Sequence, residues 1–180
     1  MIIRVVPYDA LWPAEYEAEA KRIRDAVGEV AVALHHIGST AVRGLSAKPI
    51  IDILLEASDL AELDARSPRM EALGYEAKGE FGIRGRRYFR RDNELGIRTH
   101  QVHAFDVNSE QLDRHLAFRD YLISHPEVAE AYGHLKRGLA TRFPTDINAY
   151  MEGKDSFVKH YEAEALAWRG PGPGGNLPAK

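Results

Sequence analysis

The 180-residue chain contains no cysteine. This absence excludes disulfide bonds, thiolate zinc sites and cysteine nucleophiles. The chain also lacks a long apolar run, because no stretch approaches the roughly 20 apolar residues that cross a bilayer as a helix. The amino-terminal segment turns polar after a few positions, which is unlike a secretory signal peptide. These absences predict a soluble protein without a membrane partner and favour a cytoplasmic location.

An excess of positive charge is missing as well. Lysine and arginine number 24 against 27 aspartate and glutamate, and the net charge is -3 with a sequence pI of about 6.2. Without a global positive field, binding of DNA or RNA is not expected. A small anionic ligand or a nucleotide would have to be held by a local cluster of basic side chains. The hydrophobic share of 44% is typical of an ordered globular chain.

The apolar pattern changes its period along the chain. Tyr16, Ala20, Ile23 and Val27 recur at helical spacing, which predicts a helix that Gly28 ends. Apolar and β-branched runs predict strands at 1–6, 30–37, 49–55, 75–80, 86–91 and 97–105, with a helix over 59–73.

From about residue 109 the spacing predicts helices almost to the end. The order of elements predicts an α+β fold, with a mixed β-sheet, flanking helices and a helical C-terminal part. One domain is expected over residues 1–168. Residues 169–180 are rich in glycine and proline, and this predicts a disordered tail.

The most informative stretch joins two of the predicted strands. Gly38 and Ser39 follow the first strand, where glycine allows close approach of a ligand and a helix start would point free N–H groups outward. The hydroxyls of Ser39 and Thr40 can donate to phosphate oxygens, and Lys48 can add positive charge. The next strand carries Asp52 in an otherwise apolar run, where a carboxylate must be paired, metal-bound or exposed at a cleft.

Each of these features also has a plain structural explanation. Gly-Ser after a strand is often only a turn with a cap, and a lone aspartate in a strand more often pairs with an arginine. The two features together, with Lys48 between them, favour a ligand site that includes Asp52.

Residues 36–53 read HIGSTAVRGLSAKPIIDI, and this run resembles the signature of the GrpB family. Further matching blocks fall in order at residues 6–13, 73–75, 99–103, 118–122, 132–136 and 150–154. Arg43 departs from the family pattern, which usually has proline there. The resemblance implies a nucleotidyltransferase-like fold and a relation to the C-terminal domain of some dephospho-CoA kinases.

The nucleotidyltransferase superfamily places Gly-Ser at a helix start and, on a later strand, two acids separated by one apolar residue. Gly38, Ser39 and Asp52 match this pattern, whereas the position of the second acid is Leu54. Paired carboxylates hold the cations of a two-metal mechanism, so Leu54 weakens the case for catalysis. Glu56 shares a strand face with Asp52 but lies further along, and we do not expect it to replace the missing acid.

Four further candidates are one histidine of the signature run and three residues of the later blocks. His103 lies on a strand where the superfamily has a third acid, and it could serve as a metal ligand or acid–base group. The alternative is a histidine that only hydrogen-bonds inside a packed site, and the same two interpretations apply to His36, a candidate for phosphate binding. Lys136 and Lys154 match family blocks and could line the cleft, although lysines on helices are normally solvated.

Arg84 and four arginines of the predicted strand at 86–91 surround Tyr88. Alternation places Arg86 and Arg90 beside Tyr88 on one face and Arg87 and Arg91 on the other. Arg86 and Arg90 are candidates for a phosphate clamp. The alternative is a solvated strand face.

Two functions of different class follow. As an enzyme, the protein would transfer a nucleotidyl group from a nucleoside triphosphate, with Mg²⁺ held by Asp52 and His103. As a non-catalytic module, the cleft would bind a nucleotide or another anion, or the chain would serve as a protein partner. Leu54 favours the module and the retained Ser39 and Asp52 favour the enzyme, so both stay open at this point.

Overall fold

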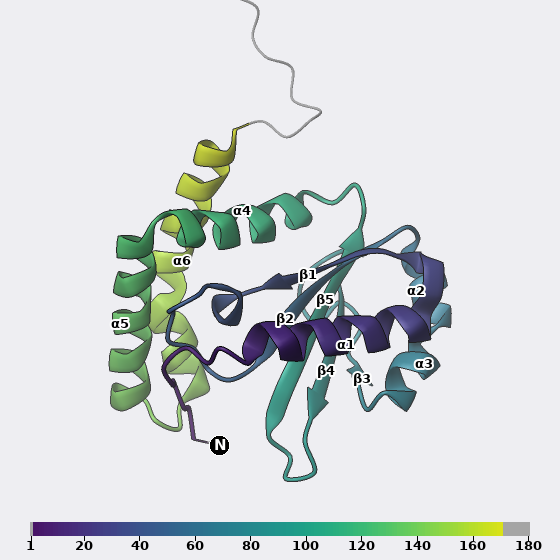
Figure 1. The fold of residues 1–180 in the computed structure, drawn as a ribbon, viewed down its shortest axis with the longest axis horizontal. Helices are drawn as coiled ribbons and strands as arrows, with labels where there is room; N and C mark the ends of the chain where they lie inside the picture. The colour runs from purple at the N-terminus through teal and green to yellow at the C-terminus, as the bar shows by residue number, and fades with distance from the viewer. Residues whose placement is uncertain (1, 171–180) are drawn as a thin grey trace, which may run out of the picture.

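The structure, a computed structural model, describes residues 2–170. A five-stranded mixed sheet has the strand order β1-β2-β5-β4-β3, and helices pack around it (Figure 1). The α+β fold with a helical C-terminal part is confirmed. The sequence predicts a disordered tail over residues 169–180, but Arg169 is the last residue of the final helix and Gly170 caps it; residues 171–180 lie outside the described residues. The elements are α1 (Trp12–Val27), η1 (Gly28–Val30), β1 (Ala31–Ile37), η2 (Ser39–Ala41), β2 (Ile51–Ala57), α2 (Leu60–Ala65), α3 (Ser67–Ala72), β3 (Glu76–Ala77), β4 (Arg87–Asp92), β5 (Arg98–Asp106), α4 (Glu110–Ser124), α5 (Pro126–Arg142) and α6 (Ile147–Arg169).

Strand β2 lies between an antiparallel and a parallel neighbour. It pairs antiparallel with β1, where Ile37 lies opposite Asp52, and parallel with β5, where Asp52 lies opposite Gln101. Because side chains alternate along a strand, Asp52 and Leu54 share one face of the sheet and Ile53 points to the other. The chain leaves β1 directly beside the Asp52 carboxylate.

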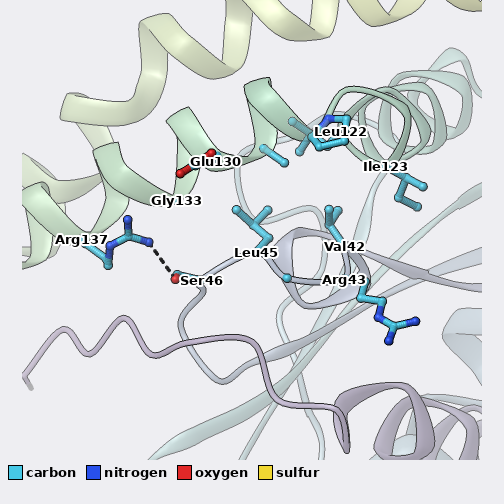
Figure 2. A pocket seen from close by; sticks show the side chains of 12 residues that line it. Val42, Arg43, Leu45, Ser46, Leu122, Ile123, Glu130, Gly133 and Arg137 are labelled. Carbon is cyan, nitrogen blue, oxygen red and sulfur yellow. Dashed lines mark hydrogen bonds between the residues drawn. The ribbon is translucent and has the colours of Figure 1, made fainter.

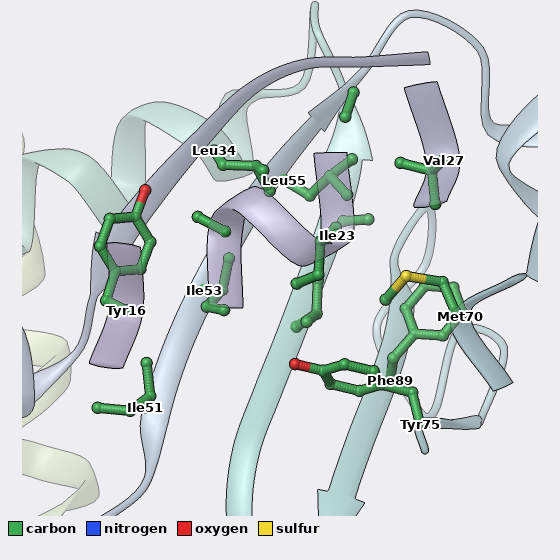
Figure 3. Packing of buried hydrophobic residues seen from close by; sticks show 14 of the residues in the cluster. Tyr16, Ile23, Val27, Leu34, Ile51, Ile53, Leu55, Met70, Tyr75 and Phe89 are labelled. Atoms are coloured by element: carbon green, nitrogen blue, oxygen red, sulfur yellow. The ribbon is translucent and has the colours of Figure 1, made fainter. Parts of the chain in front are cut away.

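Helix α1 covers the face of the sheet to which Ile53 points. Its apolar side chains, among them Ile23 and Val27, pack on Ile53 of β2 and Phe89 of β4 (Figure 3). Phe89 is 2% exposed, so this strand residue points to the core. A helix packed on one side leaves the opposite face of β2 for the polar site.

The C-terminal helices contact both the face of the sheet that carries Asp52 and the segment that follows β1. Leu54 packs with Leu112 and Leu116 of α4, while Val42 and Leu45 pack in a separate cluster with α4 and α5. Helices α5 and α6 stand side by side at the left of Figure 1. The turn after β1 is thus held between the sheet and the helical part. None of the helices in residues 2–170 is both long and apolar enough to span a bilayer.

Three predicted elements differ from the structure. The edge strand predicted over residues 1–6 is absent from the described part, which contributes only an isolated bridge between Val6 and Ala47. The helix expected over 59–73, with a bend near Pro68, is divided there into α2 and α3, because Pro68 stands in the first turn of a new helix. Strand β3 is only two residues long, because the positive φ of Gly79, 59°, interrupts the regular pairing, although Lys78 and Gly79 still form backbone hydrogen bonds with Tyr88.

Candidate functional site

Gly38 lies against the Asp52 carboxylate at the end of β1. Its φ of 72° is in the left-handed region that favours glycine. A Cβ atom added to Gly38 would lie 2.6 Å from Oδ2 of Asp52, so the missing side chain is what permits the close approach. The Asp52 side chain keeps 27% of its surface exposed. The carboxylate therefore opens into a cleft and is not sealed in apolar packing.

The turn that follows Gly38 is fixed by its own side chains. His36 Nε2 lies 2.9 Å from the Thr40 hydroxyl, which donates to the Ile50 carbonyl at 3.4 Å. The His36 ring stacks on Tyr16 with ring centres 4.8 Å apart. Burial lowers the pKa of His36 to about 4. Neither His36 nor Thr40 is among the side chains that line the cleft, and their contacts hold the turn in place.

The helix expected to begin at Gly38-Ser39 is a single 3-10 turn, η2. Val42 is extended, with φ of -105°, and Gly44 has a φ of 83°, so the backbone leaves the helical region at once. Binding of an anion at this turn must therefore depend on side chains more than on a helix dipole.

Three lysines from different elements meet near Ser39. Lys136 of α5 donates to the Ser39 hydroxyl at 2.7 Å and is itself 3% exposed. The ammonium groups of Lys48 and Lys154 lie 5.5 Å and 5.7 Å from the centre of the Tyr150 ring. We call Lys48, Lys136 and Lys154 the lysine cluster.

Burial makes the lysine cluster easy to deprotonate. It lowers the pKa of Lys136 to about 7 and that of Lys154 to about 8, and it also lowers the pKa of Lys48. Repulsion between the ammonium groups acts in the same direction on Lys136 and Lys154, whereas the charge of Asp52 raises the pKa of all three lysines. Three cationic groups thus face a single carboxylate.

The floor of the cleft is a chain of contacts across three strands. His103 Nε2 lies 3.5 Å from Oδ1 of Asp52, and Arg86 donates to His103 Nδ1 at 3.5 Å. Arginine can only donate, so this arrangement favours the tautomer of His103 that carries its proton on Nε2, toward Asp52. The Arg86 guanidinium also lies 4.9 Å from the centre of the Tyr88 ring.

The cleft has a cavity volume of about 540 Å³, within the usual range for small-molecule sites. Its lining side chains come from the segments before β2 and before β4, from strands β2, β4 and β5, and from helix α6. The lining residues are Lys48, Ile50, Asp52, Phe81, Gly82, Ile83, Arg86, Tyr88, Gln101, His103, Ile147, Met151 and Lys154.

A two-metal centre does not fit this donor set. Leu54 is fully buried among apolar side chains, and the Glu56 carboxylate lies 2.6 Å from His35 Nε2. Within residues 2–170 no three histidine, aspartate or glutamate side chains gather where they could hold a metal ion. Mg²⁺ prefers several oxygen ligands, and here Asp52 and His103 face three ammonium groups instead.

Two arginines of the sequence motifs lie away from the cleft. Arg90 donates to Glu76 at 2.5 Å, on the neighbouring strand β3, and is not among the lining residues. Arg43 borders a separate pocket of about 430 Å³ between residues 42–46 and helices α4 and α5 (Figure 2). In that pocket Arg137 donates to the Ser46 hydroxyl at 2.9 Å.

The family model described as GrpB protein matches residues 2–164. This chain belongs to the GrpB family. YqkA of Bacillus subtilis (strain 168) is 40% identical over 167 residues, which cover 93% of this GrpB chain and 48% of YqkA. The chain therefore spans about half the length of this curated relative. A dephospho-CoA kinase of Mycolicibacterium paratuberculosis is 27% identical over 190 residues, 92% of this chain and 46% of the kinase, which confirms the expected relation.

Solved structures support the same family and fold. The crystal structure of GrpB from Enterococcus faecalis has a TM-score of 0.88 and 41% identity, and the match covers 92% of this GrpB chain and 99% of that one. Cid1 in complex with the UTP analogue UMPNPP has a TM-score of 0.51 and 14% identity, over 77% of this chain and 43% of Cid1. This second likeness confirms the nucleotidyltransferase-like fold and concerns the fold alone.

Sequence reasoning assigned no role to several residues of this GrpB cleft. Tyr150 and Tyr132 match family blocks, and in the structure their rings lie beside the lysine cluster. The centre of the Tyr132 ring is 4.4 Å from Lys136 Nζ. Phe81 was missed altogether. The glycines spaced around it at 79, 82 and 85 are the signal that could have indicated an exposed turn.

Proposed function

We propose that the cleft binds the polyphosphate part of a nucleotide through the lysine cluster and Ser39. The observation that supports this is the surplus of cationic groups around one carboxylate. Lys48 and Lys154 line the cleft together with Asp52, and the buried Lys136, which does not line the cleft, donates to the Ser39 hydroxyl. Removing an ammonium from water without a counter-charge is unfavourable. A bound anion would supply that counter-charge, and its phosphate oxygens would accept hydrogen bonds from Lys48, Lys154 and the Ser39 hydroxyl.

The nucleotide part of the proposal comes from the likeness of fold. Cid1, whose structure contains a UTP analogue, resembles this chain at 14% identity. In this chain Gly38, Ser39 and Asp52 stand at the positions of the superfamily pattern. The cleft of about 540 Å³ is large enough to bury a ligand of nucleotide size.

Nucleotidyl transfer with Mg²⁺ on Asp52 and His103 is the second candidate. The retained Asp52 beside Gly38 favours it. The apolar burial of Leu54 and the single carboxylate favour binding without transfer. We therefore give binding as the function that the geometry supports best.

The binding proposal is tested by removing one charge of the lysine cluster. Lys154→Met keeps the length of the side chain, and we expect it to weaken binding of ATP, UTP and inorganic tripolyphosphate about tenfold, the effect of one charge interaction of about 1.4 kcal/mol. Lys159→Met, on the exposed side of the same helix, should leave affinity unchanged. Titration calorimetry near pH 6.5 measures both variants. Absence of heat with the wild-type protein, or equal losses in both variants, would overturn the proposal.

The sign of the effect of Asp52→Asn separates the two candidates. If Asp52 holds no metal, its loss removes a repulsion and should tighten binding of tripolyphosphate several-fold near pH 6.5, where most of the cluster stays protonated. If Asp52 holds Mg²⁺, the same change should abolish the metal-dependent part of nucleotide binding. Titrations with and without Mg²⁺ give the answer. Release of pyrophosphate by the wild-type protein, lost in Asp52→Asn, would establish the enzyme.

A further inference from the structure

The loop of residues 79–85 presents an aromatic ring at the cleft in an unusual backbone conformation. Gly79, Gly82 and Gly85 all have positive φ, and so does Phe81, with a φ of 44°. Among residues 2–170, no other non-glycine residue has a positive φ. A bulky side chain rarely adopts this conformation, and such strain persists where the surroundings enforce it. We call residues 79–85 the Phe81 loop.

A buried arginine enforces this conformation. Arg86 is 7% exposed, and its guanidinium donates to the Phe81 carbonyl at 2.7 Å and to the Glu80 carbonyl at 3.1 Å. The Glu80 carboxylate in turn accepts from the Gly85 backbone N–H at 2.7 Å. These hydrogen bonds hold the backbone of the Phe81 loop and thereby fix the position of the Phe81 ring.

The Phe81 ring is held but not buried. It stacks on Tyr88 with ring centres 5.3 Å apart and 23° between the planes, yet Phe81 is 56% exposed. Ile147 and Met151 of α6 also line the cleft and are 38% and 46% exposed. Single exposed apolar residues are ordinary, but three in one cleft leave an apolar area beside the lysine cluster.

We propose that Phe81 is the stacking site for a planar ring of the ligand, which would displace the Lys78 ammonium that lies 5.7 Å from the centre of the Phe81 ring. Ile147 and Met151 would supply further apolar lining in the same cleft. This inference rests on the proposed function and assigns a binding site to the base of the proposed nucleotide. The polyphosphate lies at the lysine cluster and the base lies over Phe81. Stacking on an aromatic side chain tolerates every base, because each has a π-face.

Comparison of nucleoside triphosphates with inorganic tripolyphosphate tests the stacking site. The wild-type protein should bind ATP and UTP about tenfold more tightly than tripolyphosphate, since stacking one base typically contributes that much. Phe81→Asn removes the ring and suits positive φ, so the loop should keep its shape. It should lower affinity for ATP and UTP about tenfold and leave tripolyphosphate binding unchanged.

Val32→Ala serves as the matched control, because Val32 is 57% exposed on β1 and does not line the cleft. It should change neither affinity. Equal affinity of the wild-type protein for ATP and tripolyphosphate would overturn the stacking site while leaving the polyphosphate proposal standing. The stacking site is equally overturned if Phe81→Asn leaves ATP binding intact or weakens both ligands alike. Failure of the wild-type protein to bind either ligand would overturn both proposals.

Discussion

Raising the pH from about 6 to about 9 should weaken tripolyphosphate binding roughly 100-fold, because two cationic groups lose their protons in this range. Burial lowers the pKa of Lys136 to about 7 and that of Lys154 to about 8. Both ammonium groups are therefore largely charged at the acidic end and largely neutral at the alkaline end. Tripolyphosphate becomes more negative over the same range, and this change alone would strengthen binding. A loss of affinity must therefore come from deprotonation of the protein.

Proton uptake gives an independent measurement. An anion in the cleft raises the pKa of the lysines, so binding near pH 7.5 should take up close to one proton, and the calorimetric enthalpy should vary with the ionisation enthalpy of the buffer. In Lys136→Met the uptake should fall and the pH dependence should flatten, while Lys159→Met should behave as the wild type. Binding that is independent of pH, with no proton uptake, would contradict a role for the lysine cluster.

Raising the pH weakens binding, but it should increase the stability of the folded protein without ligand. Because the folded pKa of Lys136 lies below its unfolded value, the unfolded state binds more protons between about pH 7 and about pH 10. The contribution of Lys136 to the free energy of unfolding therefore increases as the pH rises through that window. The ammonium groups of the cleft lower the stability of the ligand-free protein at low pH. A bound anion should therefore stabilise the protein most at low pH.

The strand and turn that carry Gly38 and Asp52 could be predicted from the sequence because their signals are local. A β-branched run predicts β1, glycine predicts its end, and an acid in an apolar run predicts exposure at a cleft. The expected helix start at Gly38-Ser39 is wrong, because Val42 and Gly44 stop η2 after one turn. Propensity alone does not decide between a helix start and a 3-10 turn.

The lysine cluster could not be derived from local patterns. Lys136 and Lys154 lie on different helices, and helical spacing does not say which side of a helix meets a turn about a hundred residues earlier in the chain. They entered only through the resemblance to the GrpB family. Arg90 shows the same limit, because its partner Glu76 lies on the two-residue strand β3, whose pairing has no signal of its own.

Gly38→Ala should destabilise the protein by about 3 kcal/mol, the largest stability effect that we expect from a single methyl group here. The new Cβ atom would lie 2.6 Å from Oδ2 and 3.1 Å from Cβ of Asp52, and the backbone would hold alanine at a φ of 72°. Rotation of the Asp52 side chain could move Oδ2, but Cβ of Asp52 is fixed to the internal strand β2, so the clash is relieved only in part. Urea unfolding measures the loss.

Gly44→Ala separates the clash from the backbone strain. Gly44 has a φ of 83° and nothing within 4 Å of an added Cβ atom, so its substitution should cost only the strain, about 1 kcal/mol. Combining Gly38→Ala with Asp52→Ala should recover part of the loss, because the carboxylate that meets the new methyl group is gone, and the double-mutant cycle reports this coupling. Equal losses for Gly38→Ala and Gly44→Ala, with no coupling to Asp52, would mean that the close approach of turn and carboxylate does not exist in solution. The cleft would then lack the geometry on which its proposed binding depends.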